Sequence, residues 1–123
     1  MSKYLDEQEV NTYLNLGRAV EVFLGRINED KEVISYLTLS KTKEDKINVT
    51  YIEHYDEGSL EFLDLYAFSY VDPDMNCEAN HFDSTEIAIK YIQERFQLNK
   101  IHFVNEGIIQ DEYAELLKSE GRN

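Results

Sequence analysis

An alternation of apolar and polar residues runs from Ala19 to Val71 and constrains the fold more than any other feature of the sequence. The alternating runs are rich in Val, Ile, Tyr, Phe and Thr, which fit the pleated surface of a sheet. Connectors of four residues separate the runs, a length typical of hairpins. The pattern predicts a four-stranded antiparallel meander over Ala19–Ile27, Glu32–Lys41, Lys46–Tyr55 and Leu60–Val71.

The last run, Leu60–Val71, is apolar on both of its sides. As a strand it would place Leu63, Leu65, Ala67 and Val71 on one face and Phe62, Tyr66, Phe68 and Tyr70 on the other. This composition predicts a central strand or a strand covered on both faces. If helices cover one face only, the aromatic side forms a patch that a second copy of the chain would bury. A homodimer through the aromatic sheet face is therefore one hypothesis.

Capping residues and apolar spacing predict three helices, over about Glu7–Leu16, Ser84–Gln97 and Ile109–Ser119. Asp6 and Glu9 have the spacing of a capping box, although the first segment also alternates like a strand. A second capping box is expected at Asp83-Ser84-Thr85-Glu86, and a short fifth strand at 101–104. These elements predict one α+β domain over residues 1–123. Its antiparallel meander has four or five strands, and the N-terminal helix and two C-terminal helices pack on one face.

The charge balance argues against several classes of partner. The chain has 25 acidic and 12 basic residues, which gives a formal net charge of −13. Such a surface repels nucleic acid and anionic membranes, so we expect neither as a partner. We see no signal peptide and no apolar stretch long enough to span a bilayer, so the expected location is the cytoplasm. The single cysteine, Cys77, fits a reducing compartment.

The acidic residues are concentrated in one part of the chain. Residues 47–89 contain ten of them and no lysine or arginine, together with seven tyrosines and phenylalanines. One interpretation is a solvated surface that serves solubility while the aromatic side chains form the core. The other is a docking surface for a basic protein, in which carboxylates steer the encounter and aromatic rings bind cations. The residues expected to bind such a partner are Glu53, Tyr55, Asp56, Glu57, Glu61 and Asp64, with Tyr51, Tyr66 and Tyr70 as aromatic anchors.

In charge, size and compactness the chain is similar to small acidic inhibitors such as immunity proteins and antitoxins, which block basic toxins that act on nucleic acids. This resemblance is one of class and is carried by no motif. It implies a protein that binds a basic partner without catalysing a reaction. Our leading hypothesis is therefore a non-enzymatic binding module.

A second hypothesis places a site in the polar segment 72–83. Oxygen-bearing side chains fall there at positions 1, 3, 5, 7, 9 and 12 of a twelve-residue window, as in an EF-hand calcium loop. Cys77 replaces the glycine of that motif, and Asp83 replaces its glutamate. The competing interpretation is a polar turn that ends in a helix cap. The candidate calcium ligands are Asp72, Asp74, Asn76, Glu78 and Asp83.

Two triplets of histidine, aromatic residue and aspartate raise the question of acid–base chemistry. They are His54-Tyr55-Asp56 and His81-Phe82-Asp83, and neither comes with an identifiable nucleophile. A small ligand-binding or hydrolytic domain would use Asp72, Asp74, His81 and Asp83. Whether the chain is an enzyme stays open, and the absence of a catalytic motif favours the negative answer.

Overall fold

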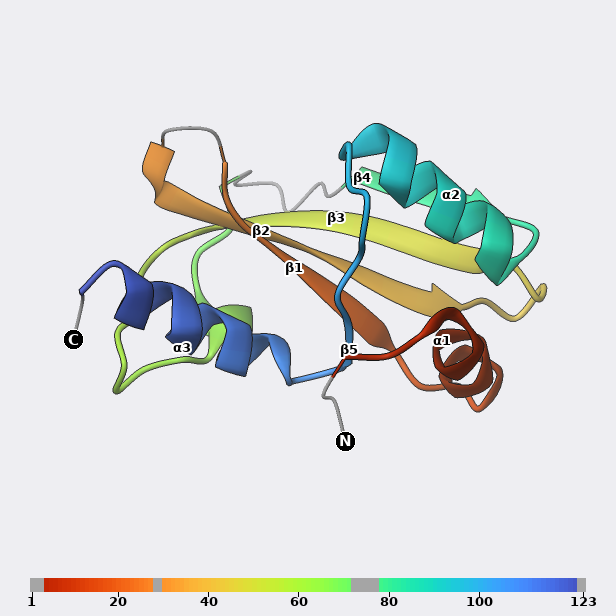
Figure 1. Cartoon of the computed structure of the whole chain (residues 1–123), viewed down its shortest axis with the longest axis horizontal. Helices are drawn as coiled ribbons and strands as arrows, with labels where there is room; N and C mark the ends of the chain where they lie inside the picture. Colours follow the sequence, from red (N-terminus) through yellow and green to blue (C-terminus); the bar gives the residue numbers. More distant parts are fainter. Residues whose placement is uncertain (1–3, 28–29, 72–77, 122–123) are drawn as a thin grey trace.

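The computed structural model describes residues 4–27, 30–71 and 78–121 and has an α+β fold (Figure 1). One antiparallel sheet of five strands has the order β4-β3-β2-β1-β5, so the first four strands form the expected meander. The elements are α1 (Glu7–Asn15), β1 (Val20–Ile27), β2 (Asp30–Lys41), β3 (Ile47–Tyr55), the 3₁₀ helix η1 (Leu65–Ala67), β4 (Glu78–Phe82), α2 (Thr85–Arg95), β5 (Phe103–Asn105) and α3 (Ile109–Ser119).

Local capping explains where the first two helices begin. At α1 both halves of the predicted capping box are present, since Asp6 accepts from the Glu9 amide and Glu9 accepts from the Asp6 amide. The helix prediction for this segment is thereby confirmed and the strand alternative is wrong. At α2 the cap is Ser84, whose hydroxyl accepts from the Ile87 amide at 3.2 Å.

The fourth strand is not where the sequence pattern placed it. Leu60–Val71 contains η1 and isolated bridges, and the fourth strand, β4, is Glu78–Phe82, in a stretch expected to be a loop. The segment 60–71 carries apolar side chains in both directions because it crosses a face of the sheet and packs side chains into the core there. Leu65 and Phe68 do this, with 0% and 2% of their surface exposed.

We call residues Asp56–Val71 the strap. It leaves the end of β3, crosses one face of the sheet and returns to the β3 edge. There Tyr70 forms a bridge with His54, and the Tyr55 amide donates to the Ser69 carbonyl at 2.9 Å. Farther along the same edge β3 pairs with β4, from Tyr51 opposite Glu78 to Ile47 opposite Phe82.

The helices cover both faces of the sheet, so the expectation that all of them pack on one face is wrong. α1 and α2 pack on a cluster that includes Val20, Val22, Leu37 and Leu39, which we call the helical face. The alternate residues of β2, Ile34 and Tyr36, pack with α3 and the strap on what we call the strap face. Figure 1 shows α3 near one end of the strands and α1 and α2 near the other. The reason is that β1 and β2 carry apolar side chains on both of their sides, so each face has to be covered.

Candidate functional site

Three polar contacts hold the strap on the sheet, and the first is an ion pair at its start. Arg26 on β1 contacts Asp56 at 2.8 Å and Glu120, beyond the end of α3, at 2.6 Å. Tyr113 of α3 also donates a hydrogen bond to Asp56. The Asp56 side chain is 2% exposed and that of Arg26 is 11% exposed. Asp56 is therefore a buried anchor, and its predicted role as a direct partner contact is not supported by this position.

The second contact lies under η1. The Tyr66 hydroxyl donates to Glu21 of β1, and the Gly107 amide donates to the same carboxylate oxygen at 3.1 Å. Glu21 is 2% exposed. Burial raises the pKa of Glu21, and the hydrogen bonds from Tyr66 and Gly107 offset part of this effect. Burial and the hydrogen bond with Glu21 also raise the pKa of Tyr66. The pair fixes η1 over the start of β1.

The third contact lies under the end of the strap. His54 of β3 is fully buried, with its Nδ1 atom 3.1 Å from the Phe68 carbonyl oxygen and its Nε2 atom 3.0 Å from the Tyr36 hydroxyl. The ring of Tyr70 packs against the imidazole at 4.5 Å between centroids. Burial lowers the pKa of His54. His54 and Asp56 thus have separate partners, and nothing in these contacts makes them an acid–base pair.

A close approach of backbone and side chains completes the strap. Gly58 is buried, and a Cβ atom there would overlap Phe68 and approach the Phe62 carbonyl oxygen at 2.5 Å and the Tyr113 hydroxyl at 2.7 Å. Only glycine fits this position without a shift of its neighbours. Glu57 adds an internal tie, because its carboxylate accepts from the Ser69 amide at 2.6 Å and from the Ser69 hydroxyl at 2.9 Å.

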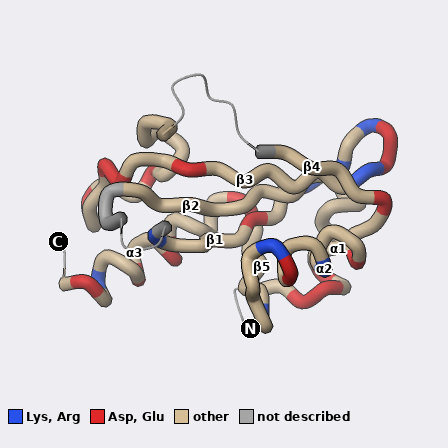
Figure 2. Tube along the Cα trace, turned by 90° about the horizontal axis from the view of Figure 1, so that it is seen from above, with Lys and Arg blue, Asp and Glu red and all other residues tan. Residues whose placement is uncertain are grey.

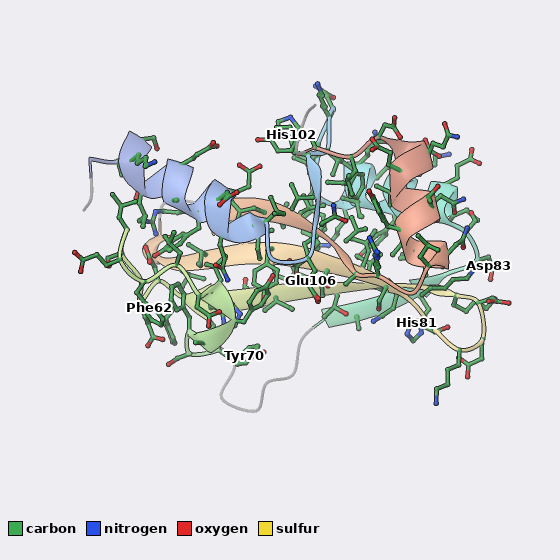
Figure 3. The ribbon with its side chains drawn as sticks, turned by 90° about the horizontal axis from the view of Figure 1, so that it is seen from below. Phe62, Tyr70, His81, Asp83, His102 and Glu106 are labelled. Atoms are coloured by element: carbon green, nitrogen blue, oxygen red, sulfur yellow. The ribbon has the colours of Figure 1, made fainter. Side chains whose placement is uncertain are left out.

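The outer side of the strap carries both apolar and acidic groups. Phe62 is 45% exposed and Tyr66 39%, large fractions for aromatic side chains. Glu61 and Asp64 are exposed on the same segment. Figure 3 shows Phe62 and Tyr70 at the end of the molecule near α3. We call Glu61, Phe62, Asp64 and Tyr66 the strap surface.

The remaining residues of the predicted docking surface are distributed over the molecule. Tyr51 stacks on Phe96, next to α2, and donates to Glu53 at 2.8 Å. Burial and the neighbouring Glu53 raise the pKa of Tyr51 to about 12. Tyr70 covers His54, whereas Tyr55 at the end of β3 is 42% exposed. The acidic residues of 47–89 that the structure describes therefore do not form one continuous face.

Most of the predicted calcium site lies outside the described residues. This applies to Asp72, Asp74 and Asn76, and only the backbone of Glu78 is described. Asp83 forms an ion pair with Lys46 instead of capping α2. Figure 3 shows His81 and Asp83 at the opposite end of the sheet from Phe62. Within the described residues, no three histidine, cysteine or acidic side chains are grouped as metal ligands.

Two open hollows occur elsewhere on the described surface. One, of about 510 Å³, lies between the end of α1 and the end of β5 and is lined by Arg18, Asn105 and Glu106 among others. The other, of about 310 Å³, lies between the starts of α1 and α2. Neither is lined by a residue of the strap or by His81 or Asp83.

The sequence interpretation missed the three residues beneath the strap: Arg26, Glu21 and Tyr36. The only signal was a glutamate inside an apolar run, Val20-Glu21-Val22-Phe23. A charged residue on the inner side of a strand indicates a buried partner, but it does not identify the partner.

No helix in the described ranges has the length and apolar character needed to cross a membrane. Comparison with protein-family models, with curated proteins and with solved structures finds no match for this chain. The interpretation of function accordingly rests on the residues and contacts given above.

Proposed function

We propose that this protein is a non-enzymatic binding module that docks a basic protein through the strap surface. The observation that carries the proposal is the combination of exposed Phe62 and Tyr66 with the exposed carboxylates Glu61 and Asp64 on a segment anchored from below. Aromatic faces beside carboxylates suit the cationic side chains of arginine and lysine. A segment already fixed in place loses little conformational entropy on binding.

The distribution of charge supports this choice of surface. At the end away from α3, Figure 2 shows both basic and acidic segments in the β2–β3 turn, where the sequence has Lys41, Lys43 and Lys46 beside Glu44 and Asp45. Lys46 also pairs with Asp83 there. No lysine or arginine occurs in the strap itself. The net charge of −13 attracts a basic protein over a distance, and the strap offers it carboxylates with few cations nearby.

We favour a basic protein as the partner and propose that this chain inhibits it. The proposal follows from the similarity in charge and size to immunity proteins and antitoxins. We also propose a cytoplasmic location, because a single cysteine fits a reducing compartment. Both proposals rest on sequence properties alone.

Capture of the partner from a lysate of the native host tests the proposal. We expect a basic protein to be retained at low salt and released at high salt. The double variant Glu61→Lys/Asp64→Lys should lower its recovery about tenfold or more, because two repulsive charges face the basic partner. The Asp64 side chain makes no capping hydrogen bond, so the substitution leaves η1 intact.

The control is Glu44→Lys/Glu94→Lys, which changes net charge equally at two exposed positions outside the strap. It should keep most of the binding. Retention that is indifferent to salt, or an equal loss in both variants, would contradict docking through the strap surface.

Self-association is the alternative that the exposed Phe62 and Tyr66 favour. The face expected to be open is covered by α3 and the strap, so a dimer would have to use the outer side of the strap. Two copies with 13 net negative charges each would repel one another at such a contact. Gel filtration at low and high salt separates the two proposals, since a dimer of this kind becomes more stable as salt rises.

A further inference from the structure

His54 lies where the strap returns to the sheet and is enclosed by groups from two elements. The Phe68 carbonyl and the Tyr70 ring cover it from the strap, and the Tyr36 hydroxyl meets it from β2. A carbonyl oxygen only accepts hydrogen bonds, so the Nδ1 atom must carry the proton. Nε2 is then the acceptor for Tyr36. Every polar atom of the neutral ring is satisfied in this arrangement.

A second proton is poorly accommodated in the closed structure. It would place a positive charge on a fully buried ring and would reverse the direction of the Tyr36 hydrogen bond. The acidic group of the strap that acts on the ring is Glu57, whose charge favours protonation but which is tied to Ser69. Within the described residues, the remaining titratable groups around the ring are tyrosines: Tyr70 on the strap, Tyr36 on β2 and, beyond Tyr36, Tyr66 of η1.

Few backbone hydrogen bonds hold the part of the strap that covers His54. Two backbone hydrogen bonds join this part of the strap to β3: Tyr55 N–H to the Ser69 carbonyl at 2.9 Å, and Val71 N–H to the Glu53 carbonyl at 3.3 Å. Breaking them and lifting residues 68–71 would expose the imidazole to water while leaving the pairing of β1, β2 and β5 unchanged.

We propose that His54 couples the opening of the strap to protonation, so that mild acid loosens residues 68–71 while the sheet stays folded. Below its ordinary pKa of 6.5 the histidine of the open form takes up a proton, whereas the closed form resists it. Acid therefore favours the open form. Because the strap surface lies on the same segment, a partner bound there would be released by acid, a consequence that rests on the proposed function.

Native-state hydrogen exchange followed by NMR tests the coupling without any partner. The reporters are the amides of Tyr55 and Val71, and their exchange is corrected for the intrinsic effect of pH. We expect the opening constant of both to rise about tenfold between pH 7.5 and 5.5, the increase set by a histidine of ordinary pKa in the open form. Amides of β2 should keep their opening constants within about twofold.

His54→Asn removes the titration while keeping a side-chain N–H donor near the Phe68 carbonyl. It should abolish the pH response, and His102→Gln, a change at an exposed histidine, should keep it. If His54→Asn does not fold, an NMR titration of the His54 imidazole in the unmodified protein replaces it as the test. The coupling requires the pKa of this ring to lie below 6.5. An unchanged opening constant, an equal rise in the β2 amides, a response that persists in His54→Asn or an ordinary pKa of the ring would each overturn the proposal.

Discussion

The two faces of the sheet are held by different interactions. On the helical face the described core is mostly apolar, with Leu14, Leu37 and Ile92 fully buried, and its buried polar residues, such as Thr85 of α2, are uncharged. The strap face buries Glu21, His54 and the Arg26–Asp56 pair among its apolar residues. Apolar packing is not directional and supplies stability, whereas hydrogen-bonded groups fix one geometry and respond to pH. The helical face together with the sheet therefore forms a stable base. The strap and α3 form a layer on the other face, and polar contacts set its position.

The largest expected effect is a cavity on the helical face. Leu37→Ala removes a fully buried side chain from the central strand β2 and should lower the free energy of unfolding by about 2–5 kcal/mol. Urea denaturation measures the loss. Leu16→Ala, at a leucine that is 64% exposed, should change it by less than about 0.5 kcal/mol. Equal effects of the two substitutions would remove the basis for calling the helical face the stable base.

The next effect concerns the ion pair on the strap face. Asp56→Ala removes one acidic partner of the nearly buried Arg26, which keeps its contact with Glu120, and should lower the free energy of unfolding by about 3 kcal/mol. Arg26→Met/Asp56→Leu replaces the pair by apolar groups and should recover much of that loss. If the double variant is less stable than Asp56→Ala, the pair is a net stabilising element, contrary to the role in positioning assigned here.

A smaller, pH-dependent effect is expected at Tyr66. Tyr66→Phe removes a hydrogen bond to Glu21 and should cost about 1.5 kcal/mol at neutral pH. Burial raises the pKa of Glu21 above 4.5, so the folded protein binds this proton more tightly than the unfolded chain. Stability associated with Glu21 is therefore highest below pH 4.5 and declines as pH rises through the raised pKa.

Tyr66 offsets part of that decline, because its hydroxyl favours the ionised carboxylate. The difference between Tyr66→Phe and the unmodified protein should shrink as pH falls towards 4.5. Unfolding curves from pH 8 to pH 4.5 measure the difference, with Tyr55→Phe as the exposed control. A difference that grows in acid would contradict this description of Glu21.

The smallest effect on stability is expected at the strap surface itself. Glu61→Lys changes an exposed side chain and should alter the free energy of unfolding by less than about 0.5 kcal/mol. Thermal unfolding measures this value, and the same variant should weaken retention of a basic partner. A large loss of stability would mean that Glu61 belongs to the anchoring contacts, and the strap surface would then need to be redefined.

The same comparison explains which parts of the fold the sequence predicted. The first three strands were predictable because runs rich in β-branched and aromatic residues are separated by short polar connectors, and the capping box of α1 is a local signal. Leu60–Val71 has the composition of a strand covered on both faces, but its buried residues, Leu65 and Phe68, pack onto one face of the sheet instead. β4 is a short strand at the sheet edge with little apolar content, so no periodic pattern in the sequence predicted it.

The site was less predictable than the fold, because its contacts are made between distant parts of the chain. Arg26 reaches Glu120 across 94 positions, and Tyr66 reaches Glu21 across 45. The sequence marks residues 47–89 as an acidic segment with many aromatic side chains. It did not separate Asp56, which is buried, from Glu61, which is exposed, since both are acidic residues beside aromatic ones.

We expect the strap to open on its own while the sheet and the helical face stay folded. Hydrogen exchange at about pH 7.5 in increasing, sub-denaturing urea tests it directly, by comparing the amides of Tyr55 and Val71 with those of β2. We expect an opening free energy at least about 2 kcal/mol lower for the strap amides than for the β2 amides, with a weaker dependence on urea. Equal opening free energies and equal urea dependence for both groups would show one cooperative unit and contradict the claim.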